Sequence, residues 1–195
     1  MCTPTAMMDM KTEKQKMLAG EPYNAWDEEL YSARIACRKT LQKLNNSIPD
    51  TQDWRDAINE LIPNSSEAFL EPPFRCDYGS NIKVGKNFYA NFNCVVLDVA
   101  EVIIGDNVLL APNVQLYTAG HPLDVQGRVE EGVEFGLPIT IGDNVWLGGG
   151  AIVCPGVTIG NNSVIGAGSV VTKDIPDNVL AAGNPCRVIR PIEQK

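Results

Sequence analysis

The sequence predicts a mainly β protein, a parallel β-helix of the hexapeptide-repeat type with helices at its N-terminal end. The strongest observation is a branched aliphatic residue at every sixth position: Ile141, Leu147, Val153, Ile159, Ile165 and Val171. A helix has a period of 3.6 residues and a strand alternates every two, so neither element keeps a period of six. A fixed period of six is typical of a solenoid whose coils consist of short straight runs and corners.

Two further positions of the repeat fit such a coil. The residue after each aliphatic is small, which permits a tight corner: Gly142, Gly148, Cys154, Gly160, Gly166 and Thr172. The fourth residue after each aliphatic is small or apolar: Val145, Ala151, Val157, Ser163, Ser169 and Ile175. We expect the aliphatic side chains to point inward and successive coils to pair as parallel strands about 4.8 Å apart.

Three helical segments precede the repeat. Residues 12–19 form a short helical pattern that Gly20 ends, and Asn24 or Asp27 can cap the next helix. The second helix has apolar residues at spacings of three and four: Leu30, Ala33, Cys37, Leu41 and Leu44. The third places Trp54, Ala57, Ile58, Leu61 and Ile62 on one face before Pro63 and Asn64 end it. Such helices bury little core alone, so we expect residues 11–66 to form a cap on the solenoid.

The β-helix is expected to cover residues 67–191, beginning near the Pro72–Pro73 pair. Its first coils are less regular: Val84, Ala90, Val96 and Val102 keep the period, which then shifts by two to Ile104, Leu110 and Leu116. The period fails between Leu116 and Ile141, where the chain makes a polar excursion over residues 121–138. Long loops inside a strict repeat are usually functional and commonly collect on the binding face.

Composition excludes several classes of protein. The net charge of −8 argues against a general binder of nucleic acid or of anionic membranes, because phosphate contacts need a basic face. One histidine and six cysteines, none at CxxC spacing, predict reduced structural thiols and no metal site. The N-terminus lacks an apolar signal segment and no run of 18 apolar residues occurs, so we expect a cytoplasmic protein without a membrane span.

The only histidine, His121, lies where the regular coil gives way to the excursion. Histidine has an unperturbed pKa near neutrality and suits general acid–base catalysis, although a lone histidine is more often structural. Asn91 takes a corner position that is normally small. It either adopts a left-handed turn conformation or donates amide hydrogen bonds to a substrate hydroxyl or an oxyanion.

Three carboxylates are candidates for acceptor contacts. Asp77 and Asp98 can accept hydrogen bonds from sugar hydroxyls, and either can equally be a solvated loop charge. Glu134 lies in the excursion and can orient His121 or bind substrate. These residue types, together with one imidazole, point to chemistry on hydroxyl groups.

A local basic group stands near the end of the last repeat: Lys173, Arg187 and Arg190. It is either a solvated end or a clamp for phosphate groups. Other β-helical proteins fit less well. A β-helical carbonic anhydrase needs three histidines for its zinc, and an ice-binding β-helix would show exposed threonine ladders, which this sequence lacks.

Residues from about 14 to 190 resemble the sugar O-acetyltransferases of the hexapeptide-repeat superfamily, the maltose and galactoside acetyltransferases. The most specific features are the His-Pro pair at 121–122 before a long loop and Ala-Asn-Phe-Asn at 90–93. Further matching segments are 17–21, 71–79, 104–108, 111–114, 171–176 and 182–189. Cys-Asp-Tyr-Gly at 76–79 and Leu-Asp-Val at 97–99 favour the maltose type. The galactoside type has a serine before the tyrosine and a second aspartate after the first.

The resemblance implies a left-handed β-helix, a homotrimer with active sites between subunits, and acetyl-CoA as donor to a sugar hydroxyl, with no metal. His121 would be the general base and Asn91 a contact to the transition state or acceptor. The donor positions would be Gly149, Ala167, Thr172, Lys173, Arg187 and Arg190, with Trp146 either in the core or a wall for the pantetheine arm. Two alternatives stay open: another acceptor, such as a galactoside, oligosaccharide or antibiotic, and a non-catalytic trimeric scaffold.

Overall fold

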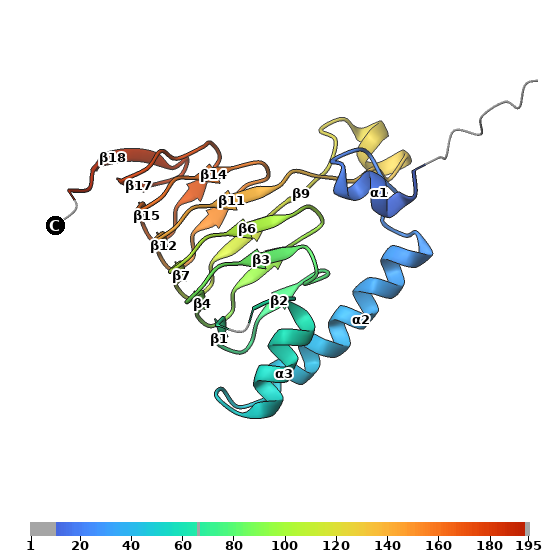
Figure 1. Ribbon diagram of the computed structural model, residues 1–195. Helices are drawn as coiled ribbons and strands as arrows, with labels where there is room; N and C mark the ends of the chain where they lie inside the picture. The colour runs from blue at the N-terminus through green and yellow to red at the C-terminus, as the bar shows by residue number, and fades with distance from the viewer. Residues whose placement is uncertain (1–10, 66, 194–195) are drawn as a thin grey trace, which may run out of the picture.

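The computed structural model describes residues 11–65 and 67–193. Its main part is a solenoid in which successive coils place short strands in three parallel sheets (Figure 1). We number the sheets face 1, face 2 and face 3 in the order in which the chain enters them, and name the turns between them corner 1–2, corner 2–3 and corner 3–1. The prediction of a mainly β, left-handed β-helix with N-terminal helices is confirmed.

Every strand is short. Face 1 contains β1 (Phe69–Leu70), β4 (Tyr89–Ala90), β7 (Leu109–Leu110), β12 (Trp146–Leu147), β15 (Val164–Ile165) and β17 (Val179–Ala182). Face 2 contains β2 (Arg75–Cys76), β5 (Val95–Leu97), β8 (Gln115–Tyr117), β13 (Ile152–Val153) and β16 (Val170–Val171). Face 3 contains β3 (Ile82–Val84), β6 (Val102–Ile104), β11 (Ile139–Ile141) and β14 (Thr158–Ile159). The last strand, β18 (Arg187–Pro191), pairs antiparallel with β17.

The six-residue aliphatic repeat forms the interior, as predicted. Ile141 is 1% exposed and the other five aliphatics are completely buried. The shift of the period in the early coils has a simple cause. The corner 2–3 that precedes strand β6 is longer than a regular corner, so the period passes from Val102 to Ile104, both of which are buried. Ile104 still pairs with Ile141, so the excursion leaves the solenoid and returns to it without breaking the ladder.

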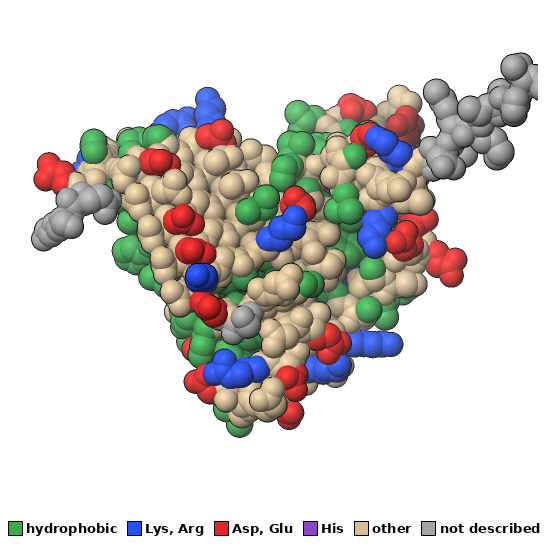
Figure 2. Space-filling view, viewed as in Figure 1, with side chains coloured by type: hydrophobic (Ala, Val, Ile, Leu, Met, Phe, Trp, Pro, Cys, Tyr) green, Lys and Arg blue, Asp and Glu red, His purple; other side chains and the backbone are tan. Residues whose placement is uncertain are grey.

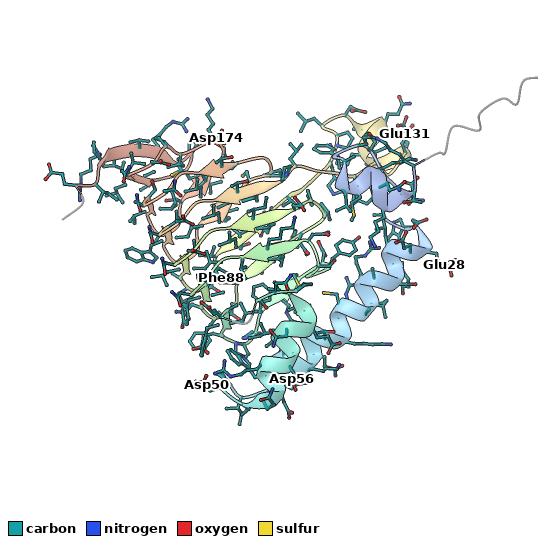
Figure 3. All side chains as sticks on the ribbon, viewed as in Figure 1. Glu28, Asp50, Asp56, Phe88, Glu131 and Asp174 are labelled. Carbon is teal, nitrogen blue, oxygen red and sulfur yellow. The ribbon has the colours of Figure 1, made fainter. Side chains whose placement is uncertain are left out.

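Corner 3–1 is built from a recurring Gly-Asp-Asn sequence, which occurs at 105–107 and 142–144. The asparagines adopt a left-handed conformation, with φ of +56° at Asn107 and +57° at Asn144. Their side chains form a ladder, since Asn107 Nδ2 donates to Asn144 Oδ1 at 2.9 Å and Asn144 Nδ2 donates to Asn162 Oδ1 at 2.9 Å. Acidic side chains follow this corner in a column (Figure 2). Asn87 extends this ladder by one coil, since its Nδ2 donates to Asn107 Oδ1 at 2.9 Å. The next residue, Phe88, is 1% exposed (Figure 3).

The three expected helices are present: α1 (Glu13–Leu18), α2 (Glu28–Asn45) and α3 (Gln52–Leu61). Thr12, Asp27 and Thr51 cap their N-termini, and Gly20, with φ of +72°, follows the first. The apolar faces of α2 and α3 join the core of the first coils. The buried indole of Trp54 donates to the carbonyl of Leu70 at 3.0 Å, which fixes α3 to face 1. These two helices therefore cover the open end of the solenoid.

The excursion forms a small substructure at corner 2–3. Strand β9 (Ala119–Gly120) pairs antiparallel with β10 (Phe135–Gly136), and a π-helical turn, η1 (Gln126–Glu130), lies between them. It packs beside α1 (Figure 1), and Tyr23 N–H donates to the carbonyl of Glu134 at 3.0 Å. The first helix thus covers the excursion, while the other two cover the first coil.

No helix of the described residues is long and apolar enough to cross a bilayer. The cysteines that the structure describes are all free thiols, as expected.

Candidate active site

A cleft of about 330 Å³ opens where the N-terminal helices, the early coils and the excursion meet. Its lining residues come from all three parts: Tyr23, Ala25, Trp26, Arg34, Arg38, Asp77, Tyr78, Leu97, Val99, Ala119, His121 and Glu134. Three candidates from the sequence, His121, Asp77 and Glu134, are therefore brought together. A cleft of this size with several converging polar groups fits a small polar ligand.

His121 directly follows β9, so the antiparallel pairing of the excursion holds its backbone. Its Nδ1–H donates to the carbonyl of Val133 at 3.3 Å, because a carbonyl can only accept. This tautomer leaves a lone pair on Nε2. Glu134 Oε1 lies 3.8 Å from Nε2, and the imidazole side chain is 49% exposed. The ring is therefore held on one side and open to a ligand on the other.

Glu134 is itself held by the N-terminal segment. Tyr23 Oη donates a hydrogen bond to Glu134 Oε2 at 2.8 Å, while Oε1 faces the imidazole. Burial and this carboxylate raise the pKa of Tyr23 well above its usual value, so the phenol stays protonated and remains a donor. The hydrogen bond between Tyr23 and Glu134 joins the cap to the excursion through the carboxylate that faces the imidazole.

Asp77 and Asp98 occupy different environments. Asp77 is half-buried in the cleft, where burial raises its pKa while Arg34 and Arg38 oppose that shift. Asp98 is completely buried, and its Oδ1 accepts the backbone N–H groups of Asp77 and Tyr78, both at 2.9 Å. Both predictions for Asp98 are therefore wrong, because a completely buried carboxyl group is neither in contact with a ligand hydroxyl in the cleft nor solvated. Asp98 supports the strand end that presents Asp77.

Corner 1–2 carries a second row of candidates on successive coils. Backbone hydrogen bonds between successive coils place Asn91, Ala111, Gly148 and Gly166 one above another, and Ala167 follows Gly166. Gly148 leaves no room for a side chain, because a Cβ there would lie 2.6 Å from the nitrogen of Ala167. The Asn91 carboxamide accepts the N–H of Phe92 at 2.8 Å. The row is therefore a strip of small residues, with the side-chain amide of Asn91 at the end formed by the earliest coil.

Two more donor candidates border this row. Trp146, half exposed on the outer side of face 1, is not a core residue. Arg187 lies on β18 opposite Ala182, directly above the row, and Arg190 follows on the same strand. Both arginines are exposed.

Thr172 and Lys173 lie elsewhere, because they follow β16 of face 2 and so stand at corner 2–3. The basic group expected from the sequence is thus divided within one chain. Corner 2–3 holds Lys173 above His121, whereas Arg187 stands over corner 1–2. Asn91 and His121 are divided in the same way. The predicted site residues of one chain therefore fall into two groups, one at corner 1–2 and one at corner 2–3, which we call half-sites.

The cap contributes cleft residues that the sequence pattern did not single out. Arg34 of α2 donates to the hydroxyl of Tyr78 at 2.7 Å and to the carbonyl of Ala25 at 2.5 Å. Trp26 is 79% exposed at the rim. In the sequence, the tryptophan at position 26 is the one feature that could have drawn attention to this part of the cap. Among the described residues no group of histidine, cysteine and carboxylate side chains is placed to hold a metal ion.

Comparison with known proteins gives consistent matches along the chain. Residues 16–63 match the maltose acetyltransferase hexapeptide capping motif, and residues 138–173 match the bacterial transferase hexapeptide repeat. A crystal structure of a maltose O-acetyltransferase from Clostridium difficile 630 is 54% identical, with a TM-score of 0.91 over 94% of this chain and 99% of that one.

Two further relatives are similar over most of their length. Galactoside O-acetyltransferase of Escherichia coli K12 is 48% identical over 93% of this chain and 90% of its own. A structure of galactoside acetyltransferase in complex with coenzyme A is 45% identical, with a TM-score of 0.87 over 94% of this chain and 92% of that one.

Proposed function

The chain belongs to the hexapeptide-repeat acetyltransferases of the maltose and galactoside type, and on this premise we propose that it transfers an acetyl group from acetyl-CoA to a sugar hydroxyl. The observation that carries the proposal is the cleft in which His121, with a free Nε2, lies among two carboxylates and two arginines. Carboxylates, guanidinium groups and an exposed indole suit a polyhydroxylated acceptor.

In the proposed step the sugar oxygen attacks the thioester carbonyl carbon while His121 Nε2 takes the hydroxyl proton. The carbon–sulfur bond then breaks, and the imidazolium returns the proton to the leaving thiolate. The bond from Nδ1–H to Val133 fixes the tautomer that this requires. Glu134, 3.8 Å from Nε2, favours the imidazolium that forms. Donor and acceptor meet directly, so no acyl-enzyme is needed.

Corner 1–2 is the proposed path of the pantetheine arm, since the small residues Gly149 and Ala167 leave the strip open beside Trp146. Arg187 and Arg190, with Thr172 and Lys173 of a neighbouring subunit, would hold the CoA phosphates. The oxyanion needs a free donor. Gly148 N–H is committed to the carbonyl of Ile165 at 2.8 Å, so Gly149 N–H and the Asn91 amide are the better candidates.

The division into half-sites leads to the proposed assembly, a homotrimer. Asn91 and the small strip stand at corner 1–2, whereas His121 and Lys173 stand at corner 2–3. A threefold axis would bring corner 1–2 of one subunit to corner 2–3 of the next and complete three equal sites. The excursion presents exposed Leu123, Val125 and Val129, which would be buried against the neighbour.

We propose an acceptor of the maltose or glucose type, because Asp77 takes the place where the galactoside type has serine. Galactosides, other oligosaccharides and antibiotics are the alternative acceptors, and a non-catalytic scaffold is the alternative without chemistry. The presence of both half-sites favours an enzyme.

The test is replacement of the proposed base. His121→Ala is expected to lower kcat by about two to four orders of magnitude, with the Kd for acetyl-CoA retained. Thiol release from acetyl-CoA is measured with glucose, maltose, galactosides and chloramphenicol. Glu130→Ala, an exposed carboxylate on the same excursion outside the cleft, is the control. Near-native turnover of His121→Ala would refute the assignment.

A further inference from the structure

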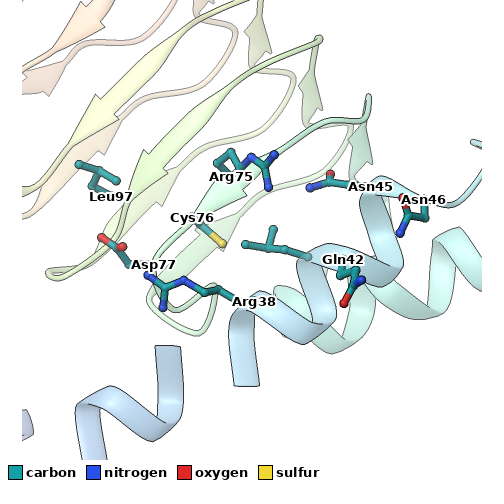
Figure 4. A pocket seen from close by; sticks show the side chains of 9 residues that line it. Arg38, Gln42, Asn45, Asn46, Arg75, Cys76, Asp77 and Leu97 are labelled. Atoms are coloured by element: carbon teal, nitrogen blue, oxygen red, sulfur yellow. The ribbon is translucent and has the colours of Figure 1, made fainter. Parts of the chain in front are cut away.

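A second and larger cavity, of about 640 Å³, lies between helix α2 and the first strands of face 2. It is lined by Arg38, Leu41, Gln42, Asn45, Asn46, Arg75, Cys76, Asp77 and Leu97 (Figure 4). Arg38, Asp77 and Leu97 also line the cleft of His121, so this larger cavity, which we call the groove, adjoins that cleft. A ligand seated at the imidazole would reach the groove by extending past Arg38 and Asp77.

The groove carries more positive than negative charge, although the whole chain has a net charge of −8. Its charged lining consists of Arg38, Arg75 and one carboxylate, Asp77. Arg38 stands beside Asp77 at the end nearer the cleft, while Arg75 lies further along, toward Asn45 (Figure 4). Neither guanidinium makes a hydrogen bond or an ion pair with another side chain that the structure describes. The planar guanidinium group binds carboxylate, sulfate and phosphate groups through paired hydrogen bonds.

The wall behind these arginines is fixed by contacts between the cap and the first coil. Asn45 Nδ2 donates to the carbonyl of Phe74 at 3.0 Å, and Phe74 N–H donates to Asn45 Oδ1 at 2.8 Å. Cys37 and Cys76 pack against each other with their sulfurs 3.6 Å apart. The groove is thus preformed. The carboxamides of Gln42 and Asn46 have no partner among the described residues and stand ready for hydroxyl groups.

We propose that this groove is a distal acceptor subsite that takes an anionic saccharide, whose carboxylate, sulfate or phosphate group is bound by Arg75 and Arg38. The acetylated sugar unit occupies the His121 cleft, and the charged unit lies next to it. This inference rests on the proposed function. The donor's phosphates are excluded as the occupant, because Arg187 and Lys173 lie at the last coils whereas this groove lies at the first two.

The test compares matched acceptors. The kcat/KM of the native chain is measured for maltose, for maltose 1-phosphate and for maltose oxidised to a uronic acid at one end, and the anionic-to-neutral ratio is taken. We expect Arg75→Gln to lower this ratio by about tenfold, since a charge-assisted pair is lost. Lys39→Gln, which removes an exposed cation from the same helix outside the groove, is the control. Equal ratios in the two variants would overturn the proposal.

A binding measurement separates this inference from the proposed function. Calorimetric titration of the anionic disaccharides is expected to give weaker binding to Arg75→Gln than to Lys39→Gln, whether or not acetylation occurs. Acceptors that bind in this way without thiol release would refute sugar acetylation and keep the subsite. Free inorganic phosphate is titrated in parallel. Should it bind as tightly as maltose 1-phosphate, the groove would be a site for free anions, and the saccharide assignment would be overturned.

Discussion

The division of the site between two corners leads to a quantitative prediction. His121→Ala and Asn91→Ala each remove one half-site and leave the other intact, because the two residues stand at different corners of the coil. In the proposed assembly, each variant alone would form trimers in which every site is damaged. In mixed trimers, a site is intact when its histidine comes from an Asn91→Ala subunit and its asparagine from a His121→Ala subunit.

The expected recovery follows from random mixing. With equal amounts of the two chains, each condition is met with probability one half, so about one quarter of the sites are intact. Coexpressed chains with different affinity tags are purified through both tags or as the unselected mixture. Thiol release of the unselected mixture is expected at about a quarter of the native rate, far above either parent.

A matched control uses two variants of one half-site. His121→Ala mixed with Asp77→Ala is expected to give no recovery, because both residues line the same cleft of a single chain. Recovery in that mixture would show that His121 and Asp77 of one chain serve different sites, and absence of recovery in the first mixture would show that Asn91 and His121 act within one subunit. Subunit exchange is verified by the dual-tag yield, so a failure to mix is distinguished from a failure to complement.

Three further predictions follow. Lys173→Ala combined with Arg187→Ala is expected to raise the KM for acetyl-CoA about 10- to 100-fold and to change the KM for sugar much less; equal changes would contradict a phosphate clamp. Tyr23→Phe removes the 2.8 Å bond to Glu134, and we expect about a tenfold lower kcat with unchanged binding of acetyl-CoA. Burial raises the pKa of Asp98 to about 6, whereas its pKa in the unfolded chain is near 4. The protonated carboxyl group therefore stabilises the fold fully below pH 4, and about 3 kcal/mol of the free energy of unfolding is lost as the pH rises through 6. The unfolding free energy of Asp98→Asn, minus that of the native chain in urea, should therefore rise by about that amount between pH 4 and 7; a constant difference would contradict the burial argument.

The core and the helices could be predicted because each obeys a local rule. A residue such as Ile159 is buried because it recurs at the sixth position, and Asp27 caps α2 because a polar side chain precedes an amphipathic segment. The excursion was visible as a failure of the period. The catalytic candidate followed from it, since His121 lies at the root of the excursion.

The grouping of site residues could not be read from proximity in the sequence. Lys173 and Arg187 are separated by 14 residues, whereas a regular coil takes 18 residues from Ile141 to Ile159. A separation shorter than one coil leaves the two cations at different corners. Tyr23 and Arg34 reach the cleft through packing of the cap on the excursion, and packing of distant segments has no periodic signal.

The regular coil also explains why the proposed chemistry depends on its interruptions. Corner glycines such as Gly148 are held so close to the next coil that a Cβ would clash with its backbone. A corner position occupied by such a glycine can present a backbone N–H group and an open strip, but it has no room for an imidazole. The proposed general base instead stands on inserted residues, since the excursion supplies His121 together with the carbonyl and carboxylate that contact it. In the proposed mechanism the strip would bind the donor because it is regular, and the excursion would activate the acceptor because it interrupts the repeat. Since the two features stand at different corners, the proposed trimer would bring them together from neighbouring subunits.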